Sequence, residues 1–238
     1  MNLGPEKAKA FVDEFLSLVS PSSNAEWVLF PPVISIPAVA EKLRGSFIKW
    51  GGQNCYFEAA GAFTGEISVA MLKEAGCSYV LVGHSERRQL FAETDEVCAK
   101  KIRAVVEQGL TPMFCVGETQ SERDAQETDQ VLRKQIFAGL NQWSRESPLV
   151  VAYEPVWAIG TGKVATPKMA DEAHAEIRRL LTEKCGPERA AAIQILYGGS
   201  VKPENSAELA AFPNIDGFLV GGASLMAKSF AQIGQIPL

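Results

Sequence analysis

The chain has 238 residues, of which 47% are hydrophobic, and its net charge is −5, from 23 Lys and Arg against 28 Asp and Glu. This length and composition fit one large domain with a sizeable core better than two domains. The sequence holds no basic block, which argues against nucleic acid and anionic membranes as partners. No apolar stretch approaches the ~18 residues that a membrane-spanning helix needs.

The cysteine count indicates a reducing environment. Five cysteines are present, an odd number without any C-x-x-C spacing, which argues against a disulfide framework or a zinc site. The first residues also lack the charged-then-apolar pattern of a secretory signal. We therefore expect a cytoplasmic protein.

Strand-like and helix-like segments alternate along the whole chain. Short apolar runs bounded by Gly or Pro indicate strands, and apolar residues at helical spacing indicate helices. In chain order, the pattern predicts a helix at 5–19, a strand at 27–30, a helix at 36–43, a strand at 47–50, a helix at 66–75, a strand at 78–82, a helix at 95–108, a strand at 111–116, a long and broken helix at 121–143, a strand at 149–153, a helix at 167–184 capped by Thr166, a strand at 193–196, a helix at 206–211, a strand at 217–220 and a helix at 226–233.

This order predicts an α/β fold. Continuous apolar strands separated by helices are typical of a parallel sheet covered by helices. Seven strands, with one helix in front that follows no strand, suggest a TIM (β/α)8-type barrel that lacks its first strand, with residues 1–238 forming a single N-terminally truncated domain. A doubly wound open sheet is the alternative.

Two side chains at strand ends could perform acid-base chemistry. Glu154 follows the strand at 149–153, where apolar neighbours should raise the pKa of a carboxyl group and allow it to act as a base. His84 ends the strand at 78–82, where an imidazole can polarise a carbonyl group. The alternatives are a surface carboxylate paired with an arginine and a hydrogen-bonded core histidine. His174 lies among charged residues of a helix, and we expect it at the surface.

The segment after Glu154 has the composition of a hinged lid, with a stiff proline at its start and small residues at its tip. A lid shields a reactive intermediate from water. Its residues are Pro155, Val156, Trp157, Ala158, Ile159, Gly160, Thr161, Gly162 and Lys163. The run from Gly160 formally fits G-x-G-x-x-A, but a nucleotide fingerprint should open a helix directly, and here the helix waits until Pro167.

A further group of small residues follows the last strands. Gly160, Ser200, Gly221 and Gly222 could place backbone N–H groups around a phosphate, and barrels often bind phosphate at these positions. The alternative is that the two Gly-Gly pairs, Gly198-Gly199 before Ser200 and Gly221-Gly222, simply form tight turns.

Together these segments resemble the triosephosphate isomerase family over the whole chain. The matching runs are Gly83-His84-Ser85-Glu86, Tyr153-Glu154-Pro155-Val156-Trp157, Tyr197-Gly198-Gly199-Ser200 and Gly221-Gly222. The resemblance implies that Glu154 is the proton-transferring base, that His84 is a neutral electrophile, and that Glu86 supports the site in a role left open. In that family a glutamate base and a neutral histidine are tuned for these roles by their surroundings.

The resemblance also implies the reaction and the assembly. The expected substrate is a small phosphorylated three-carbon compound, dihydroxyacetone phosphate or glyceraldehyde 3-phosphate, converted without a metal or organic cofactor. The loop at 58–66, which includes Thr64, resembles the segment through which members of the family form a homodimer.

One departure from the family affects the expected activity. In the family, an Asn-Trp-Lys segment on the first strand stands directly before a pair such as Met-Asn, and this chain opens with Met1-Asn2. The resemblance implies that the lysine of this segment is a catalytic group, and the asparagine and lysine are both missing from residues 1–238. Losing one preorganised electrostatic group, here the lysine, typically lowers the rate by a factor of about 10²–10³. We therefore expect strongly reduced isomerase activity, with a catalytically silent phosphate-binding barrel as the alternative.

Overall fold

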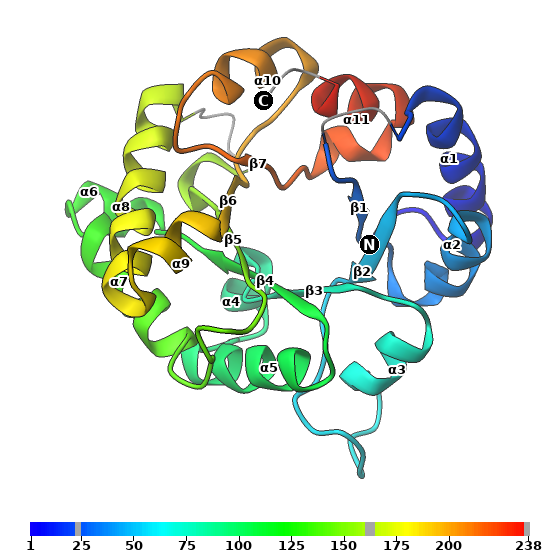
Figure 1. Cartoon of the computed structure of the whole chain (residues 1–238), viewed down its shortest axis with the longest axis horizontal. Coiled ribbons are helices and arrows are strands. Elements are labelled where there is room, and N and C mark those ends of the chain that lie inside the picture. Colours follow the sequence, from blue (N-terminus) through cyan, green and yellow to red (C-terminus); the bar gives the residue numbers. More distant parts are fainter. Residues whose placement is uncertain (22–24, 160–164, 236–238) are drawn as a thin grey trace.

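The structure is a computed structural model that describes residues 1–21, 25–159 and 165–235. Seven parallel strands form one sheet in which each strand pairs with the next one along the chain. They are β1 (Val28–Leu29), β2 (Lys49–Gly52), β3 (Tyr79–Val82), β4 (Thr111–Val116), β5 (Val150–Tyr153), β6 (Gln194–Tyr197) and β7 (Gly217–Phe218). The sheet curls on itself and the helices surround it (Figure 1).

This strand order decides between the two predicted folds. A doubly wound sheet reverses its strand order at a switch point. The order here runs from β1 to β7 without reversal, as successive right-handed βα units around a barrel require. The predicted α/β fold with seven parallel strands is confirmed, and the doubly wound alternative is wrong.

The helices form the outer layer of the curled sheet. They are α1 (Pro5–Leu18), α2 (Ile36–Leu43), α3 (Val69–Glu74), α4 (Ser85–Leu90), α5 (Asp95–Glu107), α6 (Gln120–Asp124), α7 (Thr128–Gly139), α8 (Pro167–Cys185), α9 (Pro187–Ala192), α10 (Pro203–Ala210) and α11 (Ala227–Gly234). The predicted break within 121–143 is confirmed, and Thr166 caps α8 by accepting a hydrogen bond from Met169 N. No helix of the described part of the chain is long and apolar enough to cross a membrane.

The prediction that His174 lies at the surface is wrong. His174 is fully buried on α8, and its ring meets Tyr153 edge-on at 5.8 Å between centroids. The physical reason is helical spacing: His174 shares the inward face with Ala170, which is four residues earlier, and Ile177, which is three residues later. The charged neighbours that suggested exposure lie on other faces of the same helix.

The middle of the sheet is buried on both faces. All four residues of β3 and of β5 are buried. Side chains inside the curl form one apolar cluster that includes Leu81, Met113 and Val150, while a larger cluster fills the space between the sheet and the helices. All five cysteines are buried and unpaired. Strands β3 to β5 are therefore the rigid part of the scaffold.

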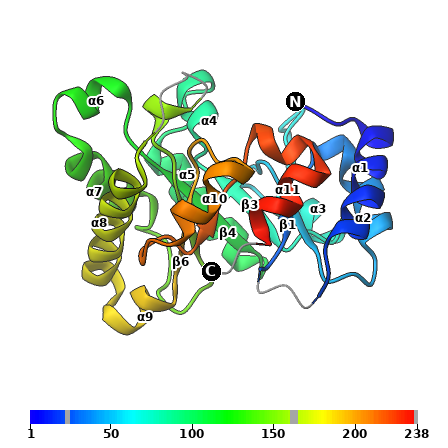
Figure 2. The same ribbon diagram turned by 90° about the horizontal axis from the view of Figure 1, so that it is seen from above.

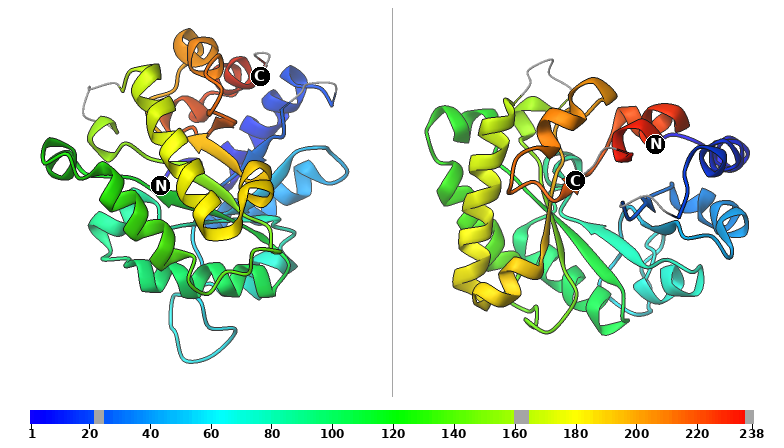
Figure 3. Two further views of the ribbon diagram at one scale, coloured as in Figure 1. Left: turned by 60° about the vertical axis from the view of Figure 1, so that its left-hand side comes forward. Right: turned by 45° about the horizontal axis from the view of Figure 1, so that its top comes forward.

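The two ends of the sheet are much shorter than its centre. Strands β1 and β7 have two residues each, and within the described residues neither pairs with a second neighbour. Outside the sheet, α1 and α11 lie side by side across this opening (Figures 1 and 3). The helical layer thus closes where the sheet does not.

The carboxyl ends of the strands lie at one end of the molecule. Figure 2 shows α4, which follows β3, at this end and α9, which precedes β6, at the opposite end. In barrels of parallel strands the chemistry occurs at the carboxyl end. The candidate residues that follow strands therefore come together there.

Candidate active site

The structure brings His84 and Glu154 into direct contact. Nε2 of His84 lies 3.0 Å from Oε1 of Glu154, although the two residues are far apart in the sequence. The backbone explains this meeting: His84 follows β3 and Glu154 follows β5, and β4 between them pairs with both strands. Among the described residues Glu154 thus lies against the ring of His84, and the alternative of an arginine-paired carboxylate is wrong.

Glu154 is almost fully buried, with 3% of its surface exposed. Burial raises the pKa of this carboxyl group, against the opposing effects of His84 and of the Ser85 and Cys115 hydrogen bonds. Ser85 contacts both oxygens: its N–H donates to Oε2 at 2.8 Å and its hydroxyl donates to Oε1 at 3.1 Å. A buried carboxylate with a raised pKa is a stronger base than an exposed one.

The geometry around His84 assigns its ring proton. The backbone N–H of Glu86 points at Nδ1 of His84 from 3.3 Å, which makes Nδ1 an acceptor and His84 the N-cap of α4. In the neutral ring the proton then lies on Nε2, the nitrogen that faces Glu154. His84 is 28% exposed and lines the cavity described below, so its N–H can reach a bound molecule.

Close packing around Glu154 leaves no room for a Cβ atom at Gly117 and little room for one at Gly198. A Cβ atom built on Gly117 would lie 1.8 Å from the carbonyl oxygen of Glu154, and one built on Gly198 would lie 3.0 Å from Glu154 Cγ. Any larger residue at Gly117 would displace the backbone of Glu154. These two glycines therefore allow the backbone and the side chain of Glu154 to occupy their present positions.

The described residues of the candidate phosphate site line the same cavity as His84 and Glu154. Ser200 follows β6, and Gly221 and Gly222 follow β7 at the start of a short 3-10 turn, Gly222–Leu225. Gly221 and Gly222 are exposed, so their backbone is open to a ligand. The prediction for Gly160 lies outside the described residues, as do those for Thr161, Gly162 and Lys163 of the lid.

The first half of the candidate lid is held by a buried carboxylate. Residues Val156–Ala158 form a 3-10 turn, and Trp157 Nε1 donates to Oε1 of Glu118 at 2.9 Å. The hydroxyl of Tyr153 and the guanidinium of Arg123 donate to the same carboxylate, at 3.1 and 2.9 Å. Arg123 also lies over the Trp157 ring at 4.5 Å. The segment after Glu154 is thus anchored at its start.

Ser85 and Glu118 belong to the site although neither is predicted from the sequence. Ser85 is the first residue of α4, a helix of only six residues. Its backbone N–H has no partner within the helix, as at every helix start, and it donates to Glu154 instead. The sequence signal was a serine directly after a strand-end histidine. Glu118 gave a similar signal, because it follows β4 just as Glu154 follows β5.

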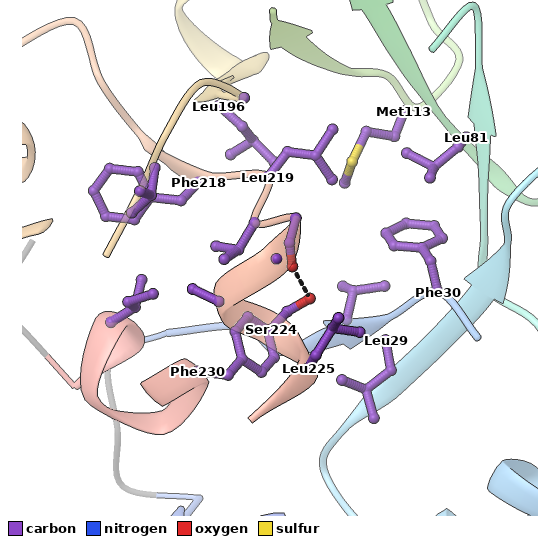
Figure 4. Close-up of a pocket in the computed structure, with 18 of the residues that line it drawn as sticks. Leu29, Phe30, Leu81, Met113, Leu196, Phe218, Leu219, Ser224, Leu225 and Phe230 are labelled. Carbon is purple, nitrogen blue, oxygen red and sulfur yellow. Dashed lines mark hydrogen bonds between the residues drawn. The ribbon is translucent and has the colours of Figure 1, made fainter. Parts of the chain in front are cut away.

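A cavity of about 1230 Å³ extends from the site into the interior of the curled sheet. The cationic side chains among its described lining are Arg87 and Lys202, and the Arg87 Nε is already held by Glu93 at 2.7 Å. Deeper in, Leu81, Met113 and Leu219 face one another (Figure 4). No group of three His, Cys, Asp or Glu side chains in the described residues is placed to hold a metal ion.

Comparisons of the sequence with known proteins identify the family of this chain. The sequence model described as triosephosphate isomerase matches residues 1–236. The chain is 50% identical over 232 residues to the triosephosphate isomerase of Bdellovibrio bacteriovorus, which covers 98% of this chain and 94% of the relative. It is 51% identical to that of Geobacter metallireducens over 229 residues, 95% of this chain and 91% of the relative. The triosephosphate isomerase of Symbiobacterium thermophilum is 50% identical over 229 residues, 95% of this chain and 90% of the relative.

Proposed function

Because the chain belongs to the triosephosphate isomerase family, we propose that it interconverts dihydroxyacetone phosphate and glyceraldehyde 3-phosphate. The observation that supports this most directly is the 3.0 Å contact between His84 Nε2 and the buried carboxylate of Glu154. It pairs a base of raised pKa with an N–H donor at the carboxyl end of a parallel sheet.

In the proposed reaction, Glu154 takes a proton from the carbon next to the substrate carbonyl. The electrons of that C–H bond form a carbon–carbon double bond, and the carbonyl oxygen becomes negatively charged. The N–H of His84 donates to this oxygen as the charge develops. A proton passes from the hydroxyl group on the deprotonated carbon to the former carbonyl oxygen. The Glu154 carboxyl then returns its proton to the former carbonyl carbon, and the other oxygen becomes the new carbonyl oxygen, which completes the isomerisation with no net change in protons.

The other residues would bind and enclose the substrate. Ser200, Gly221 and Gly222 line the cavity with exposed or half-buried backbone, which supports a role in holding the phosphate, and we assign Gly160 to the same role from the sequence. We assign residues 155–163 as the lid, with its start anchored through Trp157 and Glu118. Glu86 is exposed in the first turn of α4, and we assign it a supporting role there.

We also propose that turnover is low compared with that of the relatives. Arg87, a cationic side chain that lines the described cavity, is already engaged by Glu93. The second candidate is a barrel that binds phosphate without catalysis, which the exposed backbone of Gly221 and Gly222 beside the cavity supports.

The test is the isomerisation of glyceraldehyde 3-phosphate by protein purified from a host that lacks its own isomerase. Measurable turnover that Glu154→Gln abolishes, and that Glu146→Gln on the exposed surface leaves unchanged, would support the isomerase. The absence of turnover, with phosphate binding that is equal in wild type and Glu154→Gln, would support the silent barrel instead.

We further propose one domain, a cytoplasmic location and a homodimer. The buried, unpaired cysteines support the location. The loop that contains Thr64 projects from the rest of the chain (Figure 1) and carries an exposed Phe63, while Leu90 and Phe91 are 71% and 65% exposed. Exposed apolar side chains of this kind are typical of interfaces. Sedimentation velocity on wild type and Thr64→Glu tests the dimer, which the charge should weaken.

A further inference from the structure

Two backbone hydrogen bonds extend the pairing of β4 and β5 past the last residue of β5. The N–H of Glu154 donates to the carbonyl oxygen of Val116 at 2.8 Å. The N–H of Val156 donates to the carbonyl oxygen of Glu118 at 3.2 Å. The first bond places the residue proposed as the base, and the second places the start of the lid. Gly117 lies between the two acceptor residues, so its position affects both bonds.

Gly117 also packs directly against the backbone of Glu154. A Cβ atom built on Gly117 would lie 1.8 Å from the carbonyl oxygen of Glu154 and 2.7 Å from its carbonyl carbon. Groups packed this closely transmit displacements to each other, because the space between them holds no other atom. A shift of Gly117 therefore moves Glu154 as well.

Both backbone polar groups of Gly117 are bound by one side chain, that of Gln135. The N–H of Gly117 donates to Oε1 of Gln135 at 2.8 Å, and Nε2 of Gln135 donates to the carbonyl oxygen of Gly117 at 3.1 Å. A primary amide carries an acceptor and a donor side by side, so it matches the N–H and C=O of a single residue. Gly117 is buried, where unpaired backbone groups are costly. Gln135 thus holds Gly117 as a neighbouring strand would.

Helix α7 presents this amide from a well-packed position. Gln135 is half-buried, and it shares the inward face of α7 with Leu132, three residues earlier, and Gly139, four residues later. At Gly139 the helix comes so close to β4 that a Cβ atom would lie 2.3 Å from the ring of Phe114. The helix also packs on α5 and α8, its neighbours in the outer layer (Figure 1). The distance from Gln135 to the end of β4 is therefore fixed by the scaffold.

We propose that Gln135 is a positioning residue for the base and for the start of the lid, and that it acts through Gly117. The inference rests on the proposed function, because Glu154 is the base only in that reaction. Gly117 packs on Glu154 and is followed directly by Glu118, whose carboxylate accepts the hydrogen bond of Trp157 in the lid. One amide thereby sets where the base and the anchor of the lid lie relative to each other.

The test begins with Gln135→Met, which keeps the length of the side chain and removes both hydrogen bonds to Gly117. Gln135→Asn keeps the amide on a side chain that is one carbon shorter, and it carries the test where Gln135→Met does not fold. Two controls lie on the same helix. Gln130→Met makes the same change on the exposed face, and Ile136→Val removes a methylene group from the buried face but no hydrogen bond.

The first readout is the steady-state kinetics of isomerisation. Because a misplacement of about 1 Å can lower a rate about 100-fold, we expect Gln135→Met to lower kcat by about tenfold to 100-fold. KM should change by less than about threefold, since the proposed phosphate-binding residues follow β6 and β7 and do not contact α7. Gln135→Asn should give a smaller loss in the same direction. Both controls should stay within about twofold of the wild-type kcat.

The second readout needs no turnover. The chain contains two histidines, so its NMR spectrum has two ring Cε1–H signals, which His174→Gln assigns in protein without a histidine tag. Nε2 of His84 lies 3.0 Å from the Glu154 carboxylate, so a displaced carboxylate should shift the His84 signal. We expect this shift in Gln135→Met and in neither control. In the wild type, the amide of Gly117 should exchange slowly although it lies beyond the end of β4.

Three results would overturn the proposal. Wild-type kcat with an unmoved His84 signal in Gln135→Met would show that Glu154 does not depend on the amide. An equal fall of kcat in Ile136→Val would show a general effect of α7 stability. A changed KM with wild-type kcat would assign Gln135 to substrate binding. A wild type without turnover would instead refute the proposed function, and the His84 signal would still decide whether Gln135 positions Glu154.

Discussion

Acid should destabilise this protein through His174, a residue that is not among those lining the cavity. Its ring is fully buried between α8 and strands β5 and β6. Nδ1 lies 3.0 Å from the carbonyl oxygen of Asn214, to which it donates, and Nε2 has no hydrogen-bond partner among the described residues. Burial lowers its pKa to about 4, although the carbonyl of Asn214 and the carboxylates of Asp216 and Asp171 oppose the change.

The magnitude follows from the two pKa values. The unfolded chain binds a proton at His174 near pH 6.5, whereas the folded chain binds it only near pH 4. Between these values the unfolded state holds more protons, so the free energy of unfolding falls as the pH falls. The contribution is fully present above pH 6.5. About 2 kcal/mol is lost at pH 5 and about 3 kcal/mol at pH 4.

The assay is urea unfolding of the wild type and His174→Gln between pH 8 and pH 5. Glutamine can donate to Asn214 but does not titrate, so the variant should lose about 2 kcal/mol less stability than the wild type over this range. Ala175→Gln, which places the same side chain on the exposed face of α8, should keep the wild-type slope. Equal losses in wild type and His174→Gln would refute the reasoning.

Three other predictions follow from single contacts. Glu118→Gln should lower the free energy of unfolding by about 2–4 kcal/mol, because three donors converge on this buried carboxylate, whereas the surface-paired Glu183→Gln should change it by less than about 0.5 kcal/mol in urea titrations. Gly198→Ala should lower isomerase turnover by displacing Glu154, with Gly4→Ala, which meets open space, unchanged in the same assay. Amide hydrogen exchange should be faster in β7 than in β4, because β7 pairs with one strand, and β4 with two, in the part of the chain that the structure describes.

The ends of the central strands were predictable from the sequence, and the candidate catalytic residues follow directly after them. Apolar runs of four to six residues are unambiguous when both faces are buried, so the positions of β3, β4 and β5 and of the residues after them followed directly. His84 and Glu154 could therefore be placed at one end of the sheet before their 3.0 Å contact was known.

Short helices and isolated polar core residues were not predictable in the same way. Helix α4 spans six residues rich in charge, so it has no apolar period, and with it Ser85 remained hidden as the partner of Glu154. Helix α9 is equally short. The burial of His174 was encoded in the spacing of its apolar neighbours, but the adjacent charges outweighed that signal.

Proton transfer and phosphate binding depend on different parts of the sheet, and these parts differ in how many neighbouring strands they pair with. His84 and Glu154 follow strands that are buried on both faces and paired on both sides, so their mutual geometry does not depend on the opening. Gly221 and Gly222 follow β7, which has two residues and one neighbour. A ligand that orders these turns must supply the free energy that a second neighbouring strand would otherwise provide. A sheet that is open between β1 and β7 within the described residues should therefore weaken phosphate binding more than it disturbs the proton-transfer pair.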